Sequence, residues 1–289
     1  MSKDRLILGT RGSQLALAQS GQVARDITRL TGVPVELEVI STRGDRIIDR
    51  PLAAIGGKGL FTAELEAALR SGEIHLAVHS LKDLPTEDPD GLMLGAIPAR
   101  ADPRDALVGP PIGLLPSGAV VGTGSLRRGC QISALRPDVV VKGIRGNVDT
   151  RLAKFDRGDY DAIILAMAGL SRLSIARPDI HPLGLREMIP APGQGALGVQ
   201  CSASNAWVQS LLAAIDHPDT RRRVAAERAF LERLGGGCNI AAGCYARTEA
   251  DQLHVFAMAQ LGDRPLQRAE ARGDEPVALG QQLADILTA

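Results

Sequence analysis

Short apolar segments with the period of a β-strand alternate with longer segments with the period of an α-helix along most of this chain. We predict strands at 6–9, 35–40, 74–79, 92–97, 120–122, 139–141 and 162–165. Helices are predicted at 15–27, 62–69, 126–135 and 148–157, the first of them capped by Ser13. This alternation is typical of α/β folds, in which helices cover a largely parallel sheet.

Two breaks interrupt the alternation, at 98–104 and at the proline- and glycine-rich segment 189–195. They bracket one α/β unit, so the chain is expected to leave a first domain, build a second and return. That is the layout of a two-lobed, hinged binding protein whose ligand lies in a cleft. A third, α+β unit follows, with a helix at 220–234, a strand at 253–259 and a helix at 277–287. The expected domains are 1–98 with 194–216, 99–193, and 217–289.

Composition excludes several classes of protein. The 33 basic and 33 acidic residues give no net charge, and aromatic residues make up 2% of the chain, so a nucleic-acid-binding surface is not expected. No apolar run of about 18 residues is present, so a membrane span is not expected either. The amino-terminal segment lacks the pattern of a secretory signal. We therefore expect a cytoplasmic protein, and a monomer because no interface is evident.

One of the four cysteines stands apart from the others. Cys238 follows three glycines, whose lack of a Cβ lets a bulky ligand approach the backbone. Cys130, Cys201 and Cys244 are scattered and form no C-x-x-C pair, so neither a disulfide framework nor a metal site is expected. We expect these three to be small buried apolar residues.

Arginine accompanies hydroxyl or amide residues at three strand-to-helix junctions. A helix amino terminus offers free N–H groups, and guanidinium binds carboxylate or phosphate with two hydrogen bonds. Three such junctions at strand carboxyl ends predict a strongly anionic ligand. The plainer alternative is an ordinary helix cap with solvated arginines in an arginine-rich composition. The junctions contain Thr10, Arg11 and Ser13; Thr123, Ser125, Arg127 and Arg128; and Arg145, Gly146, Asn147 and Arg151.

A Lys-Asp pair, Lys82-Asp83, ends the strand at 74–79. Asp83 is a candidate general acid or base or a stabiliser of positive charge, and Lys82 is a candidate for anion binding or Schiff-base formation. The alternative is a surface ion pair in a turn before Pro85.

The order and spacing of short motifs along nearly the whole chain resemble the porphobilinogen deaminase family, also called hydroxymethylbilane synthases. The matching motifs are Thr10-Arg11-x-Ser13, Thr42-Arg43-Gly44-Asp45, Gly56-Gly57-Lys58-Gly59-Leu60-Phe61, His79-Ser80-x-Lys82-Asp83, Asp102-Pro103-Arg104-Asp105-Ala106, Gly122-Thr123-x-Ser125-Leu126-Arg127-Arg128, Arg145-Gly146-Asn147-Val148-x-Thr150-Arg151, Gly193-Gln194-Gly195 and Gly236-Gly237-Cys238.

The resemblance implies three domains, of which two are α/β lobes like those of type II periplasmic binding proteins, around a cleft, and the third is a small α+β domain. It implies a dipyrromethane cofactor, one per chain, joined to Cys238 by a thioether and made from two porphobilinogen units. Four porphobilinogen molecules are then added with loss of ammonia, and water releases the linear tetrapyrrole hydroxymethylbilane, a step of haem biosynthesis.

The resemblance also implies roles for individual residues. Asp83 and Lys82 are the expected catalytic residues. Beside these two and Cys238, the expected cofactor-binding residues are Thr123, Ser125, Arg127, Arg128, Arg145 and Gly146. The expected substrate-binding residues are Arg11, Ser13, Lys58, Phe61, Arg145, Arg151, Arg172 and Gln194. Each pyrrole carries an acetate and a propionate, which gives a reason for the arginines.

The sequence departs from the family pattern at a few positions and leaves two other functions open. Gly124 stands where a second serine is frequent, and Ala54 where some members carry lysine. One alternative is a non-enzymatic anion-binding protein that needs neither Cys238 nor Asp83. The other is an acyl- or phosphoryl-transferring enzyme with Cys238 as its nucleophile, which requires a histidine base; the nearest in sequence are His217 and His254.

Overall fold

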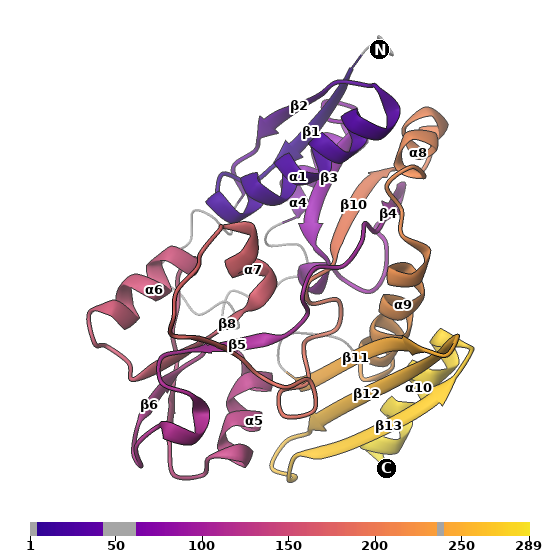
Figure 1. The fold of residues 1–289 in the computed structure, drawn as a ribbon. Helices are drawn as coiled ribbons and strands as arrows, with labels where there is room; N and C mark the ends of the chain where they lie inside the picture. Colours follow the sequence, from indigo (N-terminus) through magenta and orange to yellow (C-terminus); the bar gives the residue numbers. More distant parts are fainter. Residues whose placement is uncertain (1–4, 43–61, 236–239) are drawn as a thin grey trace. The chain divides into compact units, whose positions relative to one another are not determined.

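The computed structural model describes residues 5–42, 62–235 and 240–289 and contains three β-sheets (Figure 1). The chain divides into two compact units. One consists of Met1–Arg100 and Ala196–Arg221, and the other of Ala101–Gly195 and Arg222–Ala289.

The first unit is built on a five-stranded sheet with the order β2-β1-β3-β10-β4. The strands β2, β1 and β3 run parallel, whereas β10 is antiparallel to both β3 and β4. The elements are β1 (Leu6–Thr10), α1 (Gln14–Thr31), β2 (Val35–Val39), α4 (Ala63–Ser71), β3 (Leu76–Ser80), the 3-10 turn η1 (Leu81–Asp83), β4 (Leu92–Ala96), β10 (Leu197–Ser202) and α8 (Ala206–Leu212).

Local sequence signals explain why α1 begins and ends where it does. The Ser13 hydroxyl accepts a hydrogen bond from the N–H of Ala16 at 3.3 Å, which satisfies one free donor of the first turn. Gly32 ends the helix in the left-handed conformation, with φ of 74°. The apolar face of α1 packs with α8 on one side of the sheet, and α4 covers the other side. Both faces of the sheet are thus buried, as a mostly parallel sheet requires.

The second unit contains a five-stranded sheet of the same design, with the order β7-β6-β8-β5-β9. Here β7, β6 and β8 are parallel, and β5 is antiparallel to β8 and β9. Helix α5 packs on one face, and α6 and α7 pack on the other. The elements are β5 (Asp105–Val108), the 3-10 turn η2 (Ile112–Leu114), β6 (Val120–Gly122), α5 (Leu126–Leu135), β7 (Val140–Lys142), α6 (Val148–Asp156), β8 (Ala162–Ala166), α7 (Met167–Arg172) and β9 (Ile180–Pro182).

The second unit also contains a three-stranded antiparallel sheet, β11-β12-β13. Its first hairpin turns at Ala250 and Asp251, both with positive φ, as a two-residue hairpin loop requires. One face packs on α10, with Phe230 of α9 in the same core cluster. The elements are α9 (Pro218–Arg233), β11 (Ala241–Glu249), β12 (Gln252–Gln260), β13 (Gln267–Gly273) and α10 (Pro276–Thr288).

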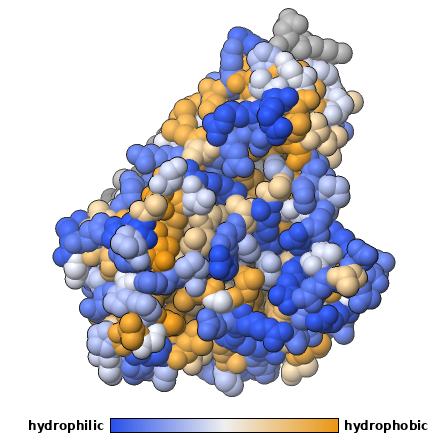
Figure 2. All heavy atoms as spheres, viewed as in Figure 1, coloured by the Kyte–Doolittle hydropathy of each residue, from blue (hydrophilic) through white to orange (hydrophobic). Residues whose placement is uncertain are grey.

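The structure confirms the predicted fold class, two α/β sheets and a small α+β part. The exact domain limits, including the one at residue 217, remain predictions. Within the described residues, no helix has the length and apolar character needed to cross a bilayer. Figure 2 shows hydrophilic residues gathered over the strands β11–β13, in agreement with the alternating exposure along β13.

Candidate functional site

The first group of predicted site residues lies at the carboxyl ends of β1 and β3, which are neighbours in the first sheet. Thr10 is fully buried, and its hydroxyl accepts a hydrogen bond from Ser20 at 2.8 Å. Ser13 caps α1, so its oxygen already serves the helix, and Arg11 between them is half-buried. This junction therefore places one guanidinium beside a helix amino terminus, an arrangement that attracts anions.

Lys82 and Asp83 form the exposed end of a short, well-anchored turn after β3. The N–H of Leu81 donates to the carbonyl of Ala196, and the Gln19 amide donates to the Ser80 hydroxyl at 2.9 Å. The first contact fixes the backbone of the turn and the second holds the side chain of the residue before it, while the two charged side chains are exposed. An exposed carboxylate on a fixed turn is free to meet a reacting molecule.

His79, which belongs to the same predicted motif, is buried on the α4 face of the sheet, opposite to the face of Ser80. Burial lowers the pKa of His79 to about 4, and the positive charge of Arg11 acts in the same direction; the side chain of Gln200 opposes both. The imidazole is therefore neutral near pH 7. Sequence analysis assigned it no role.

In the second unit, the junction between β6 and α5 is organised by hydroxyl groups. The Thr123 hydroxyl accepts from the N–H of Ser125 at 3.2 Å, and the Ser125 hydroxyl accepts from the N–H of Arg128 at 3.5 Å. Gly124 is exposed between them, and a Cβ there would lie 2.9 Å from the carbonyl oxygen of Ile144. The absence of a side chain at this position thus permits the close approach of two loop backbones.

Arg127 and Arg128 are almost fully buried and share one carboxylate, that of Asp105 at the start of β5. Asp105 accepts from Arg127 at 2.7 Å on one oxygen and from Arg128 at 2.7 and 3.0 Å on the other. Burial alone would raise the pKa of Asp105, but the two guanidinium groups outweigh it and hold that pKa well below its ordinary value. The Gln194 amide donates to the same carboxylate at 2.9 Å. Asp105 received no role in the sequence analysis, although it lies in one of the matched motifs.

Three further arginines lie on the loops and helices that follow β7 and β8. Arg151 donates to the carbonyl of Gly146 at 2.7 Å, and burial, with the charges of Arg128 and Arg145, lowers its pKa. Arg145 is exposed. Arg172 donates to the carbonyl of Gly195 at 2.9 Å.

The Nε atom of Arg172 is buried and has no hydrogen-bond partner within the described part of the chain. Burial also lowers the pKa of this guanidinium to about 10. A buried donor with no acceptor is costly, so the side chain is suited to receive an acceptor from a ligand.

Three predicted site residues, Lys58, Phe61 and Cys238, lie outside the described residues. The other cysteines are free thiols in sheltered positions, with Cys201 and Cys244 fully buried. Burial raises the pKa of Cys201 to about 11 and also raises that of Cys130. Neither of these two thiols is activated as a nucleophile.

The two histidines considered as bases for a nucleophilic cysteine are engaged elsewhere. The ring nitrogens of His254 lie 3.2 and 3.3 Å from carboxylate oxygens of Glu249 and Glu270. His217 accepts from the N–H of Thr220 at 3.1 Å. These contacts give no support to a cysteine-histidine mechanism.

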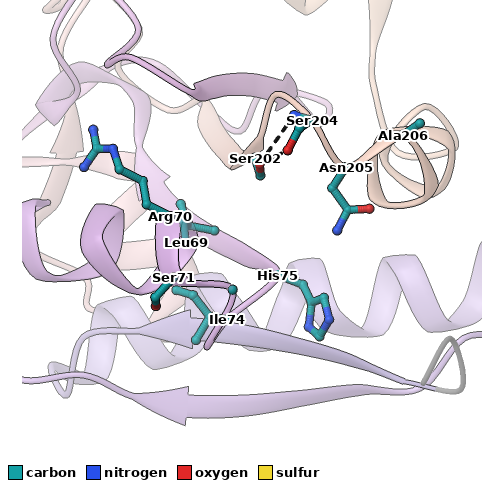
Figure 3. A pocket seen from close by; sticks show the side chains of 10 residues that line it. Leu69, Arg70, Ser71, Ile74, His75, Ser202, Ser204, Asn205 and Ala206 are labelled. Atoms are coloured by element: carbon teal, nitrogen blue, oxygen red, sulfur yellow. Dashed lines mark hydrogen bonds between the residues drawn. The ribbon is translucent and has the colours of Figure 1, made fainter. Parts of the chain in front are cut away.

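A cavity of about 360 Å³ lies at the opposite end of β3 from Lys82 and Asp83. It is bordered by the end of α4, by His75 before β3, by Ser202 at the end of β10 and by Asn205 after it (Figure 3). His75 accepts a hydrogen bond from the N–H of Ile7 at 3.0 Å, so one ring nitrogen is occupied. None of the predicted site residues that the structure describes lines this cavity.

Two family models and two full-length relatives match this chain, and all four point to the same family. The family model described as porphobilinogen deaminase, dipyromethane cofactor binding domain, matches residues 6–210, and the one described as porphobilinogen deaminase, C-terminal domain, matches residues 221–289. The porphobilinogen deaminase of Roseiflexus sp. strain RS-1 is 50% identical over 292 residues, covering 99% of this chain and 96% of that protein. That of Roseiflexus castenholzii is 48% identical with the same coverage.

Among solved structures, the periplasmic VFT2 domain of Bordetella pertussis BvgS aligns with a TM-score of 0.43 at 14% identity, covering 73% of this chain and 86% of that domain. The fold is that of an α/β protein with arginine residues on the loops and helices that follow its strands. The two family models and the full-length relatives take the assignment further: the chain belongs to the porphobilinogen deaminase family.

Proposed function

We propose that this chain condenses four porphobilinogen molecules head to tail, with release of ammonia, on a dipyrromethane primer, and then hydrolyses off the linear tetrapyrrole hydroxymethylbilane. The family supports the reaction class. The observation that carries the proposal onto this structure is the set of arginines at strand ends, above all the buried Arg172 Nε with no acceptor among the described residues.

The residues present fit a cofactor that is rich in carboxylates. Each pyrrole ring bears two acidic side chains, and the second unit offers guanidinium groups whose burial strengthens their interaction with an anion. Burial lowers the pKa values of Arg151 and Arg172, and among the described residues no carboxylate opposes the shift of either one. A bound carboxylate would supply a counter-charge.

The chain's own residues divide the work of holding the primer and the growing product. We propose that the cofactor carboxylates are bound by Lys82, Thr123, Ser125, Arg127, Arg128, Arg145 and Gly146. We assign the incoming substrate to Arg11, Ser13, Lys58, Phe61, Arg145, Arg151, Arg172 and Gln194. When bound, dipyrromethane supplies the electron-rich pyrrole carbon on which the chain grows.

Asp83 is the proposed catalytic carboxylate. It is exposed on a turn whose backbone is anchored to Ala196 and whose preceding residue, Ser80, is held by Gln19, so it can be held at a reacting molecule without reorganising. A carboxylate there stabilises the positive charge that develops on the substrate as ammonia leaves, and it can accept a pyrrole N–H proton. Lys82, next to it, pairs with the acidic side chains of the ring.

We also propose a thioether attachment of the primer to Cys238, because a tether would keep the growing end at high effective concentration. The other thiols are poor candidates for the anchor, since burial raises the pKa values of Cys130 and Cys201. The cytoplasmic location and the monomeric state remain predictions from the sequence.

Intact-mass measurement of the denatured protein tests the function and the anchor together. We expect wild type to carry an excess equal to two deaminated pyrrole units, Cys238→Ser to carry none, and the matched control Cys130→Ser to carry the wild-type excess. Asp83→Asn should keep the cofactor but lose nearly all turnover of porphobilinogen. If the protein shows its bare sequence mass even after incubation with porphobilinogen, the proposed function is wrong.

A further inference from the structure

The cluster formed by Asp105, Arg127, Arg128 and Gln194 is buried at the carboxyl end of β8, in the second sheet. Asp105 is fully buried and is paired with Ala166, the last residue of β8. Beyond Asp105, Arg127 donates to the carbonyl of Ile189 at 2.7 Å. Arg128 donates to the carbonyl of Ile164 at 3.0 Å. Both guanidinium groups are therefore fixed by a carboxylate on one side and a backbone carbonyl on the other.

The fold itself does not require a carboxylate at this position. The first sheet has the same strand design, and there β10 takes the place of β5. The residue that corresponds to Asp105 is Leu197, paired with Ser80 at the end of β3 and itself 2% exposed. A buried ion pair is seldom more stabilising than apolar packing of similar volume. The charged cluster in the second sheet thus needs a reason other than stability.

The cluster retains an excess of positive charge. Two guanidinium groups share one carboxylate, and the charges of Arg128 and Arg145 act together on Arg151. Asp105 therefore removes part of the repulsion between the arginines without neutralising them. Asp105 also fixes the orientation of the guanidinium groups. Arg128, for example, donates from both Nε and Nη2 to the same carboxylate oxygen. A guanidinium group has five N–H donors, so each of the two arginines keeps N–H groups beyond those that contact Asp105 and the carbonyls of Ile189 and Ile164.

Gln194 connects this cluster to the segment by which the chain leaves the second sheet. Its amide donates to Asp105 at 2.9 Å and to the carbonyl of Pro103 at 2.8 Å. The neighbouring Gly193 donates its N–H to Glu227 at 2.7 Å. The carboxylate of Asp105 is thus itself held by a third buried side chain whose backbone is anchored.

We infer that Asp105 is a positioning residue: its carboxylate sets the direction and the net charge of Arg127 and Arg128, so that these two arginines bind the cofactor's carboxylates. The inference rests on the proposed function. It assigns no contact between Asp105 and the cofactor, since a carboxylate there would repel one. Asp105 acts through the two arginines alone.

Two substitutions separate orientation from charge. Asp105→Asn removes the negative charge and leaves two buried guanidinium groups without it. Asp105→Glu keeps the charge but moves it by one methylene group, so the protein is expected to fold with misdirected arginines. Asp179→Asn is the matched control, because Asp179 accepts two hydrogen bonds from Arg177 in the same unit, away from the cluster.

The measurements are the fraction of purified chain that carries the cofactor, by intact mass, the KM and kcat for porphobilinogen, and the melting temperature. For Asp105→Glu we expect a near-native melting temperature, a cofactor-loaded fraction lower by about 10-fold or more, and a KM raised by about 10- to 100-fold, as for loss of one hydrogen bond to a charged group. Asp179→Asn should load and turn over as wild type does.

Three outcomes would contradict either the role of Asp105 or the proposed function. Wild-type cofactor loading and KM in a folded Asp105→Glu protein overturn the inference while the proposed function stands. Failure of both Asp105 variants to fold also overturns it, in favour of a purely structural role. An absence of cofactor from wild type itself, even after incubation with porphobilinogen, instead refutes the proposed function.

Discussion

The buried His79 makes the stability of the first unit depend on pH. The residue is 7% exposed, and burial lowers its pKa to about 4 from the ordinary value of 6.5. In the folded protein the imidazole is therefore neutral over a range in which the unfolded chain already binds a proton. Acid consequently favours the unfolded state, and this contribution to stability is lost as the pH falls from about 6.5 to about 4.

The size of the effect follows from the two pKa values. One pKa unit corresponds to about 1.36 kcal/mol, so the step from 6.5 to about 4 amounts to about 3 kcal/mol between pH 7 and pH 4. Below pH 4 both states are protonated and the loss levels off. A stability difference of 3 kcal/mol is a substantial part of the total for a typical domain.

The assay is urea unfolding followed by the fluorescence of Trp207, the single tryptophan of the chain. Trp207 packs against the core of the unit that contains His79, so its signal reports the relevant transition. We expect wild type to lose about 3 kcal/mol more than His79→Gln between pH 7 and pH 4. His217→Gln, a half-buried imidazole in the same unit, is the control and should follow wild type. Parallel curves for wild type and His79→Gln would refute the reasoning.

Two glycines give further predictions. Gly280→Ala should lower unfolding free energy by about 1–3 kcal/mol, because the new Cβ would lie 2.2 Å from the carbonyl oxygen of Ala226 on α9; a raised melting temperature, the usual effect of alanine in a helix, would contradict the close helix contact. Gly146 has φ of 110°, and a Cβ there would lie 2.6 Å from the Thr150 side chain. Gly146→Ala should therefore lower both the melting temperature and the cofactor-loaded fraction by mass, whereas Gly143→Ala, with no neighbour within 4 Å, should change neither.

The sequence was informative wherever structure is decided locally. The strand at Leu6–Thr10 and the helix from Gln14 could be predicted because periodicity and the Ser13 cap act within a few residues. The strands β11 and β13 were not predicted. β13 reads as a polar segment, Gln267–Gly273, with few strand-forming residues, and it is a strand because β12 pairs with it.

In the candidate site, too, features set by adjacent residues could be predicted, whereas features set by tertiary packing could not. The arginines at helix amino termini could be recognised from sequence, because the junction and the side chain are adjacent. The burial of Arg127 and Arg128 against Asp105 could not, since it depends on the insertion of β5 beside β8. Likewise, nothing in the local sequence separates His79, buried, from Lys82, exposed three residues later.

The position of β10 in the first sheet has a consequence for how the protein is made. β10 lies between β3 and β4, yet it is synthesised after every strand of the second α/β sheet. Until Leu197–Ser202 leaves the ribosome, β3 lacks its antiparallel neighbour and β4 lacks its partner in the sheet. The nascent first unit therefore exposes unpaired strand edges while about 100 further residues are translated, which takes roughly 5 to 20 seconds. During that interval we expect the unpaired strand edges to be open to pairing with other chains.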